Sequence, residues 1–184
     1  MKRVELEHII RAASGITKQA EIVIIGSQSI LGQFPNASPK LLDSMEADVF
    51  PLRRPELSDE IDGVMGELSP FHQTHGIYAH GVAEDTAILP IDWKKRLIPV
   101  QNQNTGHGIG LCLEAHDLAV SKLVAGREKD IDFVQAMLEE RMIKPQILEE
   151  RIRLTPLSNE RLELTIFRLR RINAAVQSKI PDSE

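Results

Sequence analysis

Two carboxylates and a glycine–serine pair are the residues whose types and spacing suggest chemistry. Glu46 and Asp48 stand two positions apart in a segment with a strand period, so their side chains should share one face. Neighbouring carboxylates repel each other unless a cation lies between them, and Mg²⁺ bound to phosphate oxygens meets that need. Gly26 and Ser27 end an apolar run, where glycine lets a phosphate approach the backbone and serine can bind its oxygens. Together they predict a metal–nucleotide site, although each half alone also fits a plain strand end or an exposed strand face.

A second group of charged residues lies in the last third of the chain. Lys122 and Arg127 could both bind a triphosphate, the lysine as a point charge and the arginine as a fork. Asp130 could orient one of these cations. A solvated charged turn between two helices is the alternative interpretation.

The elements that must position the first group are strands separated by turns. A helix is expected over residues 6–13, closed by Gly15, and another after Ser58 as its N-cap. Residues 28–34 could form a short helix after Ser27, and the glycine-rich residues 101–110 predict a loop. Strands are expected at residues 21–25, 46–50, 76–82, 86–89 and 97–100.

The second half of the chain is predicted to be helical. Helices are expected at residues 113–125 and 128–142, after Pro145, and after Ser158 as an N-cap, with a frayed tail beyond residue 178. Strands followed by helices predict an α/β (α+β) fold with a mixed sheet. The expected core spans residues 1–110, and the helical C-terminal portion, residues 111–184, packs on it as part of one compact unit.

Composition bounds the class of protein. The 184 residues carry 42% hydrophobic side chains and a formal net charge of −5, which fits a globular protein without a general attraction to nucleic acid or acidic membranes. Cys112 is the single cysteine, so no intrachain disulfide can form. No apolar stretch approaches a signal peptide core or a membrane span, and a cytoplasmic location without a membrane partner is expected.

Several stretches resemble known families. The run V-I-I-G-S at residues 23–27 with E-A-D-V at 46–49 resembles the signature of the nucleotidyltransferase superfamily. The run K-L-V-A-G-R-E-K-D-I-D-F at 122–133 resembles the second signature of AbiEii-type nucleotidyltransferases, which are toxins of type IV toxin–antitoxin systems. More closely, the chain resembles an uncharacterised bacterial nucleotidyltransferase-like family in residues 69–82, 86–97 and 112–123.

The resemblance implies a site and its ligands. Gly26 and Ser27 would bind the phosphates of a nucleoside triphosphate, and Glu46 and Asp48 would bind Mg²⁺ or Mn²⁺. Lys122 and Arg127 would touch the phosphates or order the site, and Asp130 would support them. The acceptor of a transferred nucleotidyl group would be RNA or protein, and a cognate antitoxin-type protein is a possible partner.

One departure from the superfamily pattern concerns the third carboxylate. Active members usually carry it on a later core strand, but the strand expected at residues 76–82 offers His80. Asp62 and Asp85 are possible substitutes, and imidazole suits softer metals better than Mg²⁺. The alternative function is therefore a nucleotide-binding or toxin–antitoxin partner module with a degenerate, non-catalytic site.

Overall fold

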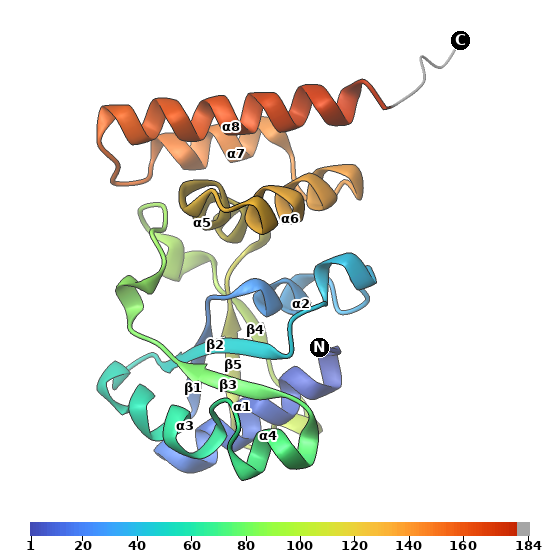
Figure 1. Cartoon of the computed structure of the whole chain (residues 1–184). Coiled ribbons are helices and arrows are strands. Elements are labelled where there is room, and N and C mark those ends of the chain that lie inside the picture. Colours follow the sequence, from blue (N-terminus) through green and yellow to red (C-terminus); the bar gives the residue numbers. More distant parts are fainter. Residues whose placement is uncertain (180–184) are drawn as a thin grey trace. The chain divides into compact units, whose positions relative to one another are not determined.

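The structure, a computed structural model, describes residues 1–179 (Figure 1). The chain divides into two compact units, the first made of Met1–Ala87 with Lys94–Glu114 and the second of Ile88–Trp93 with Ala115 onward. Residues 180–184, on which most of the expected fraying falls, lie outside the described residues. Among the residues described, no helix combines the length and the apolar character needed to cross a bilayer.

The first unit is built on a mixed sheet. Within the described residues, five strands lie in the order β3-β2-β1-β5-β4. β1 pairs antiparallel with β2 and parallel with β5, while β2 pairs parallel with β3. The strands are β1 (Glu21–Ile24), β2 (Glu46–Pro51), β3 (Tyr78–Gly81), β4 (Ile98–Val100) and β5 (Ile109–Cys112). A mixed sheet followed by helices confirms the α/β fold that the sequence predicts.

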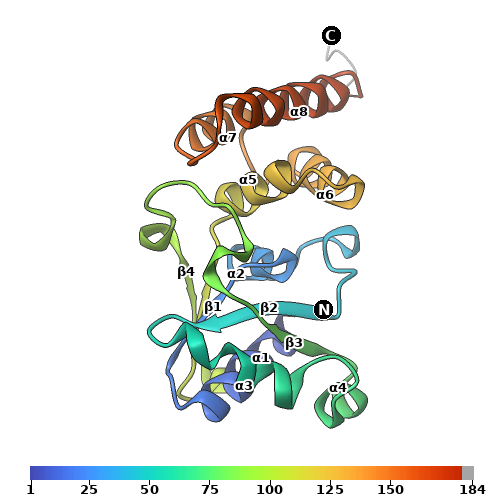
Figure 2. The same cartoon turned by 60° about the vertical axis from the view of Figure 1, so that its left-hand side comes forward.

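Helices cover one face of this sheet. Figures 1 and 2 both show α1 and α3 on the same side of the strands. The central strand β1 carries an uninterrupted apolar run, as a strand with neighbours on both edges does, and Ile22, Val23 and Ile24 are fully buried. The helices of this unit are α1 (Arg3–Thr17), α2 (Ile30–Gln33), α3 (Ser58–Met65) and α4 (Pro70–His75). The short helix expected after Ser27 is confirmed as the 3-10 turn η1 (Ser27–Ser29) followed by α2.

Two expected helix ends are wrong. Gly15 does not close the first helix, because α1 continues to Thr17 and the left-handed residue that ends it is Lys18 (φ 54°). Ser58 is not an N-cap but the first helical residue of α3. Its hydroxyl donates instead to the carbonyls of Pro55 and Val82, the latter at 2.9 Å, and so attaches α3 to the end of β3.

The strand β5 was not expected, because the three glycines of residues 101–110 indicated a loop. The structure shows why a glycine stands within the strand: a Cβ on Gly110 would lie 2.3 Å from Cδ1 of Ile10. The missing side chain lets α1 pack closely on β5. Glycine therefore marks close helix–sheet packing here, and the expected loop over residues 101–110 is wrong at its last two positions.

The thiol of Cys112 is buried at the end of β5, and burial raises its pKa to about 12. An unfolded cysteine ionises near pH ~8.5, so the buried thiol stabilises the fold below that pH and this contribution is lost as the pH rises. We expect iodoacetamide at about pH 8 to alkylate Cys112 at least ~100-fold more slowly in the folded than in the unfolded protein. Mass spectrometry of quenched samples measures both rates, and equal rates would contradict the buried position.

The strand expected at residues 86–89 is absent from the described structure. Glu84–Thr86 forms the 3-10 turn η4 instead, and the chain then enters the second unit at Ile88. There the N–H of Ile91 donates to the carbonyl of Leu154 at 2.9 Å. The apolar residues that indicated a strand therefore belong to a segment that pairs with the end of a helix.

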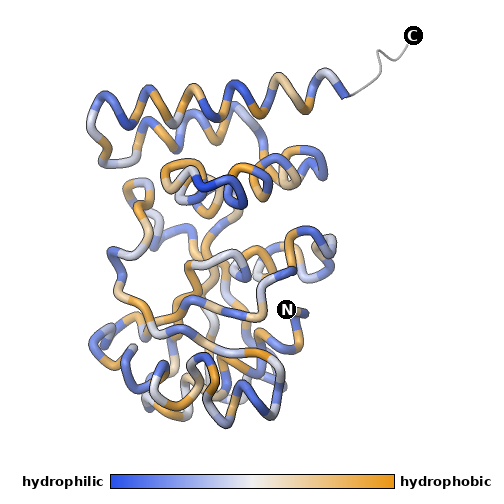
Figure 3. The backbone as a smooth tube through the Cα atoms, in the orientation of Figure 1, coloured by the Kyte–Doolittle hydropathy of each residue, from blue (hydrophilic) through white to orange (hydrophobic). Residues whose placement is uncertain are grey.

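The second unit consists mainly of helices. Figure 3 shows hydrophobic and hydrophilic residues alternating along the longest of them, as in an amphipathic helix. Ser158 caps this helix as expected, accepting a hydrogen bond from the N–H of Arg161. The helices are α5 (Ala115–Ala125), α6 (Glu128–Glu139), α7 (Pro145–Arg153) and α8 (Asn159–Gln177). The predicted helices are confirmed, although α5 begins two residues after the expected residue 113 and α6 ends before the expected residue 142.

Candidate metal and nucleotide site

The parallel register of β2 and β3 brings four polar side chains together on one face of the sheet. Glu46 lies opposite Tyr78, and Asp48 lies opposite His80. Because alternate residues of a strand point to the same face, all four share a face, while Ala47 between the two carboxylates is buried. Glu46, Asp48 and His80 each offer a ligand atom, and these atoms lie within 4.8 Å of one another. As expected, the two carboxylates therefore lie on the same face of the sheet.

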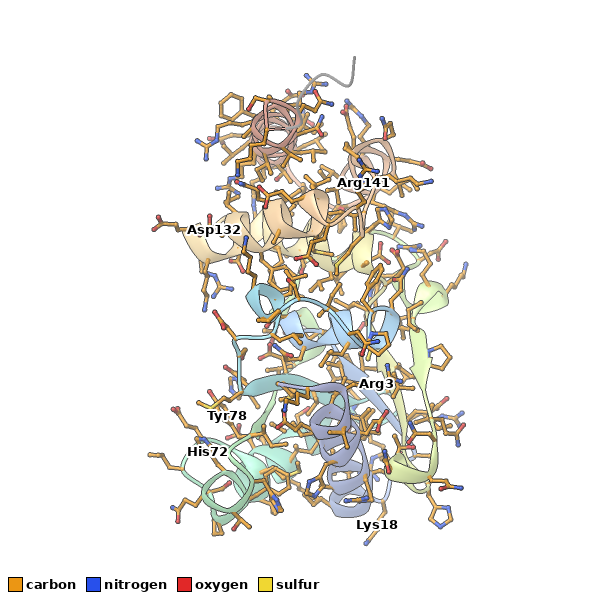
Figure 4. The ribbon with its side chains drawn as sticks, turned by 90° about the vertical axis from the view of Figure 1, so that its right-hand side faces the viewer. Arg3, Lys18, His72, Tyr78, Asp132 and Arg141 are labelled. Carbon is orange, nitrogen blue, oxygen red and sulfur yellow. The ribbon has the colours of Figure 1, made fainter. Side chains whose placement is uncertain are left out.

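Tyr78 orients the carboxylate of Glu46. Its hydroxyl donates to Oε2 of Glu46 at 3.3 Å, and its ring packs on that of His72, with 4.8 Å between the centroids. Figure 4 shows these two labelled side chains as neighbours. Burial, followed by the charge of Glu46, raises the pKa of Tyr78 to about 12. The hydroxyl therefore keeps its proton at neutral pH and remains a donor, which leaves Oε1 of Glu46 for another partner.

Gly26 lies directly against Asp48. A Cβ added at Gly26 would stand 1.9 Å from Oδ2 of Asp48, and the N–H of Ile25 donates to the carbonyl of Asp48 at 3.1 Å. The backbone of Gly26 is extended, with φ −80° and ψ −173°, so its conformation is open to any residue. Glycine is required here for space, because a side chain would displace the carboxylate. The structure thus brings the glycine–serine turn and the Glu-x-Asp strand together.

The turn after Gly26 holds two buried polar residues that the sequence analysis did not single out. Gln28 and Ser29 are fully buried, and their side-chain nitrogen and oxygen atoms have no hydrogen-bond partner among the described residues. Such a group lowers stability by about 1–3 kcal/mol. Folding alone therefore does not explain polar residues at these positions. The only sequence signal was their place next to Ser27.

His80 lies on β3, the strand on which a third carboxylate would be expected. Its Nδ1 lies 3.2 Å from Oε1 of Glu46 and 3.7 Å from Oδ1 of Asp48, and its Nε2 lies 3.9 Å from Oδ1 of Asp62. Of the two substitutes, Asp62 on α3 is thus adjacent to the ring. Asp85 lies on η4 and is not one of the three grouped ligands in the described part of the chain.

The donor atoms decide which cation this group can hold. The carboxylate oxygens of Glu46 and Asp48 are ligands that Mg²⁺ and Mn²⁺ accept, and the absence of a side chain at Gly26 leaves room for the carboxylate of Asp48. The third donor is an imidazole nitrogen, which Mg²⁺ binds poorly and transition metals bind well. The two carboxylates therefore fit the expected ion, while the complete set of three does not favour Mg²⁺.

The two histidines of α4 contact different residues. His72 accepts a hydrogen bond at Nδ1 from the N–H of Leu68, at 3.0 Å. His75 instead lies against His8 of α1, with 4.5 Å between the ring centroids. The two rings have different neighbours, so packing and hydrogen bonding account for them.

The charged residues of the second unit form a group of their own. Asp130 is 1% exposed and receives the guanidinium of Arg127 at 2.6 Å and the ammonium of Lys122 at 3.1 Å. Burial alone would raise the pKa of Asp130, but the hydrogen bond from Arg127 and the charge of Lys122 outweigh it and lower that pKa. Lys122 also lies 5.3 Å from the ring centroid of Phe133. Asp130 thus contacts both cations, and this network fixes the turn between α5 and α6.

One family model matches most of the chain. A family model described as nucleotidyltransferase of unknown function (DUF6036) matches residues 4–173. The chain belongs to this family. Neither a curated protein nor a solved structure matches it. The family description supports the nucleotidyltransferase resemblance, and it supports neither the AbiEii-type resemblance nor a toxin–antitoxin role.

Proposed function

We propose that the protein binds a nucleoside triphosphate with a divalent cation and transfers a nucleotidyl group to a hydroxyl of RNA or protein. The observation that carries the proposal is the contact between Gly26 and Asp48, which joins the glycine–serine turn to the paired carboxylates. Membership of a nucleotidyltransferase family supports the same reaction class. Substrate positioning and neutralisation of phosphate charge are the main demands of such a transfer.

Each residue of this site has a proposed role. Glu46 and Asp48 would hold the divalent cation, and Tyr78 would orient Glu46 through its hydroxyl. When bound, the cation would neutralise phosphate charge and assist the attacking hydroxyl and the leaving pyrophosphate. Ser27 would bind phosphate oxygens, and Gly26 would leave room for them beside Asp48. Because η1 and α2 are short, the hydroxyl of Ser27 matters more in this proposal than a helix dipole.

The charged residues of the second unit would have a structural role rather than a chemical one. Lys122 and Arg127 were expected to touch the phosphates or to order the site, with Asp130 in support. Both cations bind Asp130, and Lys122 is largely buried. These contacts favour the ordering role, in which the three residues fix the conformation between two helices.

A second function is favoured by one feature, the histidine in place of a third carboxylate. A site with fewer negative charges would bind a nucleotide without turning it over, as a sensor or as a partner module. A cognate protein partner, of the antitoxin type or another, would then recognise the nucleotide-bound protein.

The test is label transfer from each α-labelled nucleoside triphosphate, with Mg²⁺ or Mn²⁺ and with total RNA or the protein itself as acceptor. We expect transfer by the wild-type chain and a loss of at least about a hundredfold in the Glu46→Gln/Asp48→Asn double variant, because the cation site is removed. The matched control is Asp59→Asn/Glu60→Gln, which removes two exposed carboxylates from α3 and should leave transfer unchanged.

The other outcomes separate the two functions. Nucleotide binding by equilibrium dialysis without any transfer would refute the enzyme and support the binding module. Transfer that survives in the double variant would show that the two carboxylates do not hold the catalytic cation. Absence of both binding and transfer would refute the role given to Gly26 and Ser27.

A further inference from the structure

The imidazole of His80 has a different environment on each of its two nitrogens. Nδ1 is turned to the paired carboxylates, at 3.2 Å from Glu46 and 3.7 Å from Asp48. Nε2 is turned to a separate carboxylate, that of Asp62, at 3.9 Å. A histidine that binds a metal through one nitrogen commonly donates the N–H of the other to a carboxylate, which fixes the ring and its tautomer. At 3.9 Å the carboxylate of Asp62 lies beside Nε2 but beyond hydrogen-bond distance, so a small movement of either side chain would complete this arrangement.

Packing between α3 and β3 places Asp62 at the ring. A Cβ on Gly81 would stand 1.9 Å from the carbonyl oxygen of Ser58 and 3.3 Å from Cβ of Asp62, so glycine lets the helix lie directly on the strand. The hydroxyl of Ser58 donates to the carbonyl of Val82 and holds the helix there. Because β3 is an edge strand, the side chain of Asp62 can approach the ring at the open edge. The close packing of the α3 and β3 backbones therefore sets the position of Asp62.

A simple ion pair does not account for this arrangement as well. The side chain of His80 is 52% exposed and that of Asp62 is 49% exposed, and ion pairs between such groups contribute little to stability. Glu46 and Asp48, two carboxylates on one face of β2, would also keep their mutual repulsion without a bound cation. A divalent cation bound by both carboxylates and by Nδ1 resolves the repulsion and uses every donor of the group.

We propose that His80 is the third metal ligand, through Nδ1, that Asp62 positions its ring, and that the site selects a transition-metal ion such as Co²⁺, Mn²⁺ or Zn²⁺ over Mg²⁺. The proposal rests on the cation site of the proposed function and names the metal class for it. Imidazole nitrogen raises the affinity for these ions much more than for Mg²⁺, which prefers an all-oxygen environment. His80 thus replaces the missing carboxylate as a ligand and changes the preferred metal.

The experiment measures metal selectivity directly, without turnover. The full chain is titrated with MgCl₂ and with CoCl₂ by calorimetry, and the visible absorption of bound Co²⁺ reports nitrogen ligation. The variants are His80→Asp, which restores an oxygen donor, and Asp62→Asn, which removes the carboxylate behind the ring. The control is His107→Asp, the same chemical change at an exposed residue of the first unit.

We expect the wild-type chain to bind Co²⁺ more than about tenfold more tightly than Mg²⁺, since nitrogen donors favour transition metals. His80→Asp should reduce this ratio at least about tenfold and change the Co²⁺ spectrum. Asp62→Asn should weaken Co²⁺ binding by about tenfold to a hundredfold, the usual effect of losing the partner of a ligating histidine. His107→Asp should behave as wild type.

An unchanged ratio and spectrum in His80→Asp would overturn the proposal, as would a wild-type chain that binds Mg²⁺ as tightly as Co²⁺ or binds neither. If circular dichroism shows that His80→Asp does not fold, Asp62→Asn, a change on the exposed face of the helix, tests the proposal by itself. Wild-type Co²⁺ affinity in Asp62→Asn would refute the role of Asp62. The label-transfer assay separates the two proposals. Metal selectivity without transfer would support the ligand set and refute the enzymatic function. Transfer that does not depend on His80 would support the enzymatic function and refute the ligand set.

Discussion

Gly26→Ala should weaken the binding of the divalent cation while the fold persists. The new methyl group would stand 1.9 Å from Oδ2 of Asp48 and 3.1 Å from its Cβ, so the carboxylate must rotate away. We expect the affinity for the divalent cation to fall about tenfold to a hundredfold, as when the orientation of a ligand is lost. The side chain of Asp48 is 31% exposed and can turn towards solvent, so the free energy of unfolding should fall by only about 1 kcal/mol. Calorimetric metal titration and urea unfolding measure the two quantities.

The controls for this variant separate steric displacement from a general effect of alanine. Gly15 lies inside α1 with nothing within 4 Å of an added Cβ, so Gly15→Ala should stabilise the protein by about 0.5–1 kcal/mol and leave metal affinity unchanged. If Gly26 acts through Asp48, Gly26→Ala/Asp48→Asn should bind metal no more weakly than Asp48→Asn alone. Additive losses in that double variant, or a Gly26→Ala chain with wild-type affinity, would show that the contact does not serve the metal.

Local patterns were sufficient to predict the main part of the candidate site. The apolar run of β1 and the two-residue period of Glu46 and Asp48 are properties of short segments, and the structure has both strands. Their adjacency followed from the resemblance, and pairing of β1 with β2 provides it. His80 could likewise be identified as the residue in the third position, because it lies on the strand expected there.

Features that depend on packing between distant segments could not be predicted. Gly110 indicated a loop because a glycine in sequence looks the same whether it gives flexibility or makes room for Ile10 of α1. Asp62 could be named only as one of two alternatives, because its position depends on how α3 lies on Gly81. The burial of Gln28 likewise arises from tertiary contacts of a turn whose sequence is polar.

Asp130→Asn should destabilise the helical unit by about 3 kcal/mol, because removing one partner of a buried ion pair leaves the other charge without compensation. Most of this cost arises at Lys122, whose side chain is 15% exposed and would lose its charged partner, while the ring of Phe133 stays 5.3 Å from its ammonium. Arg127, at 62% exposure, can be hydrated and should contribute at most about 1 kcal/mol. Urea unfolding followed by the circular dichroism of the helices measures the change.

The pH dependence of the stability of Asp130→Asn tests whether the charge of Asp130 stabilises the fold. Since the pKa of Asp130 is lowered in the folded protein, its ionised form stabilises the fold above the unfolded pKa of about 3.9, and this contribution is lost as the pH falls further. The stability difference between wild type and Asp130→Asn should therefore be largest at neutral pH and shrink below about pH 4. Asp132→Asn, on the exposed side of the same helix, should change stability by less than about 0.5 kcal/mol at any pH. A difference for Asp130→Asn that stays constant into acid would show that packing, rather than charge, makes Asp130 important to the helical unit.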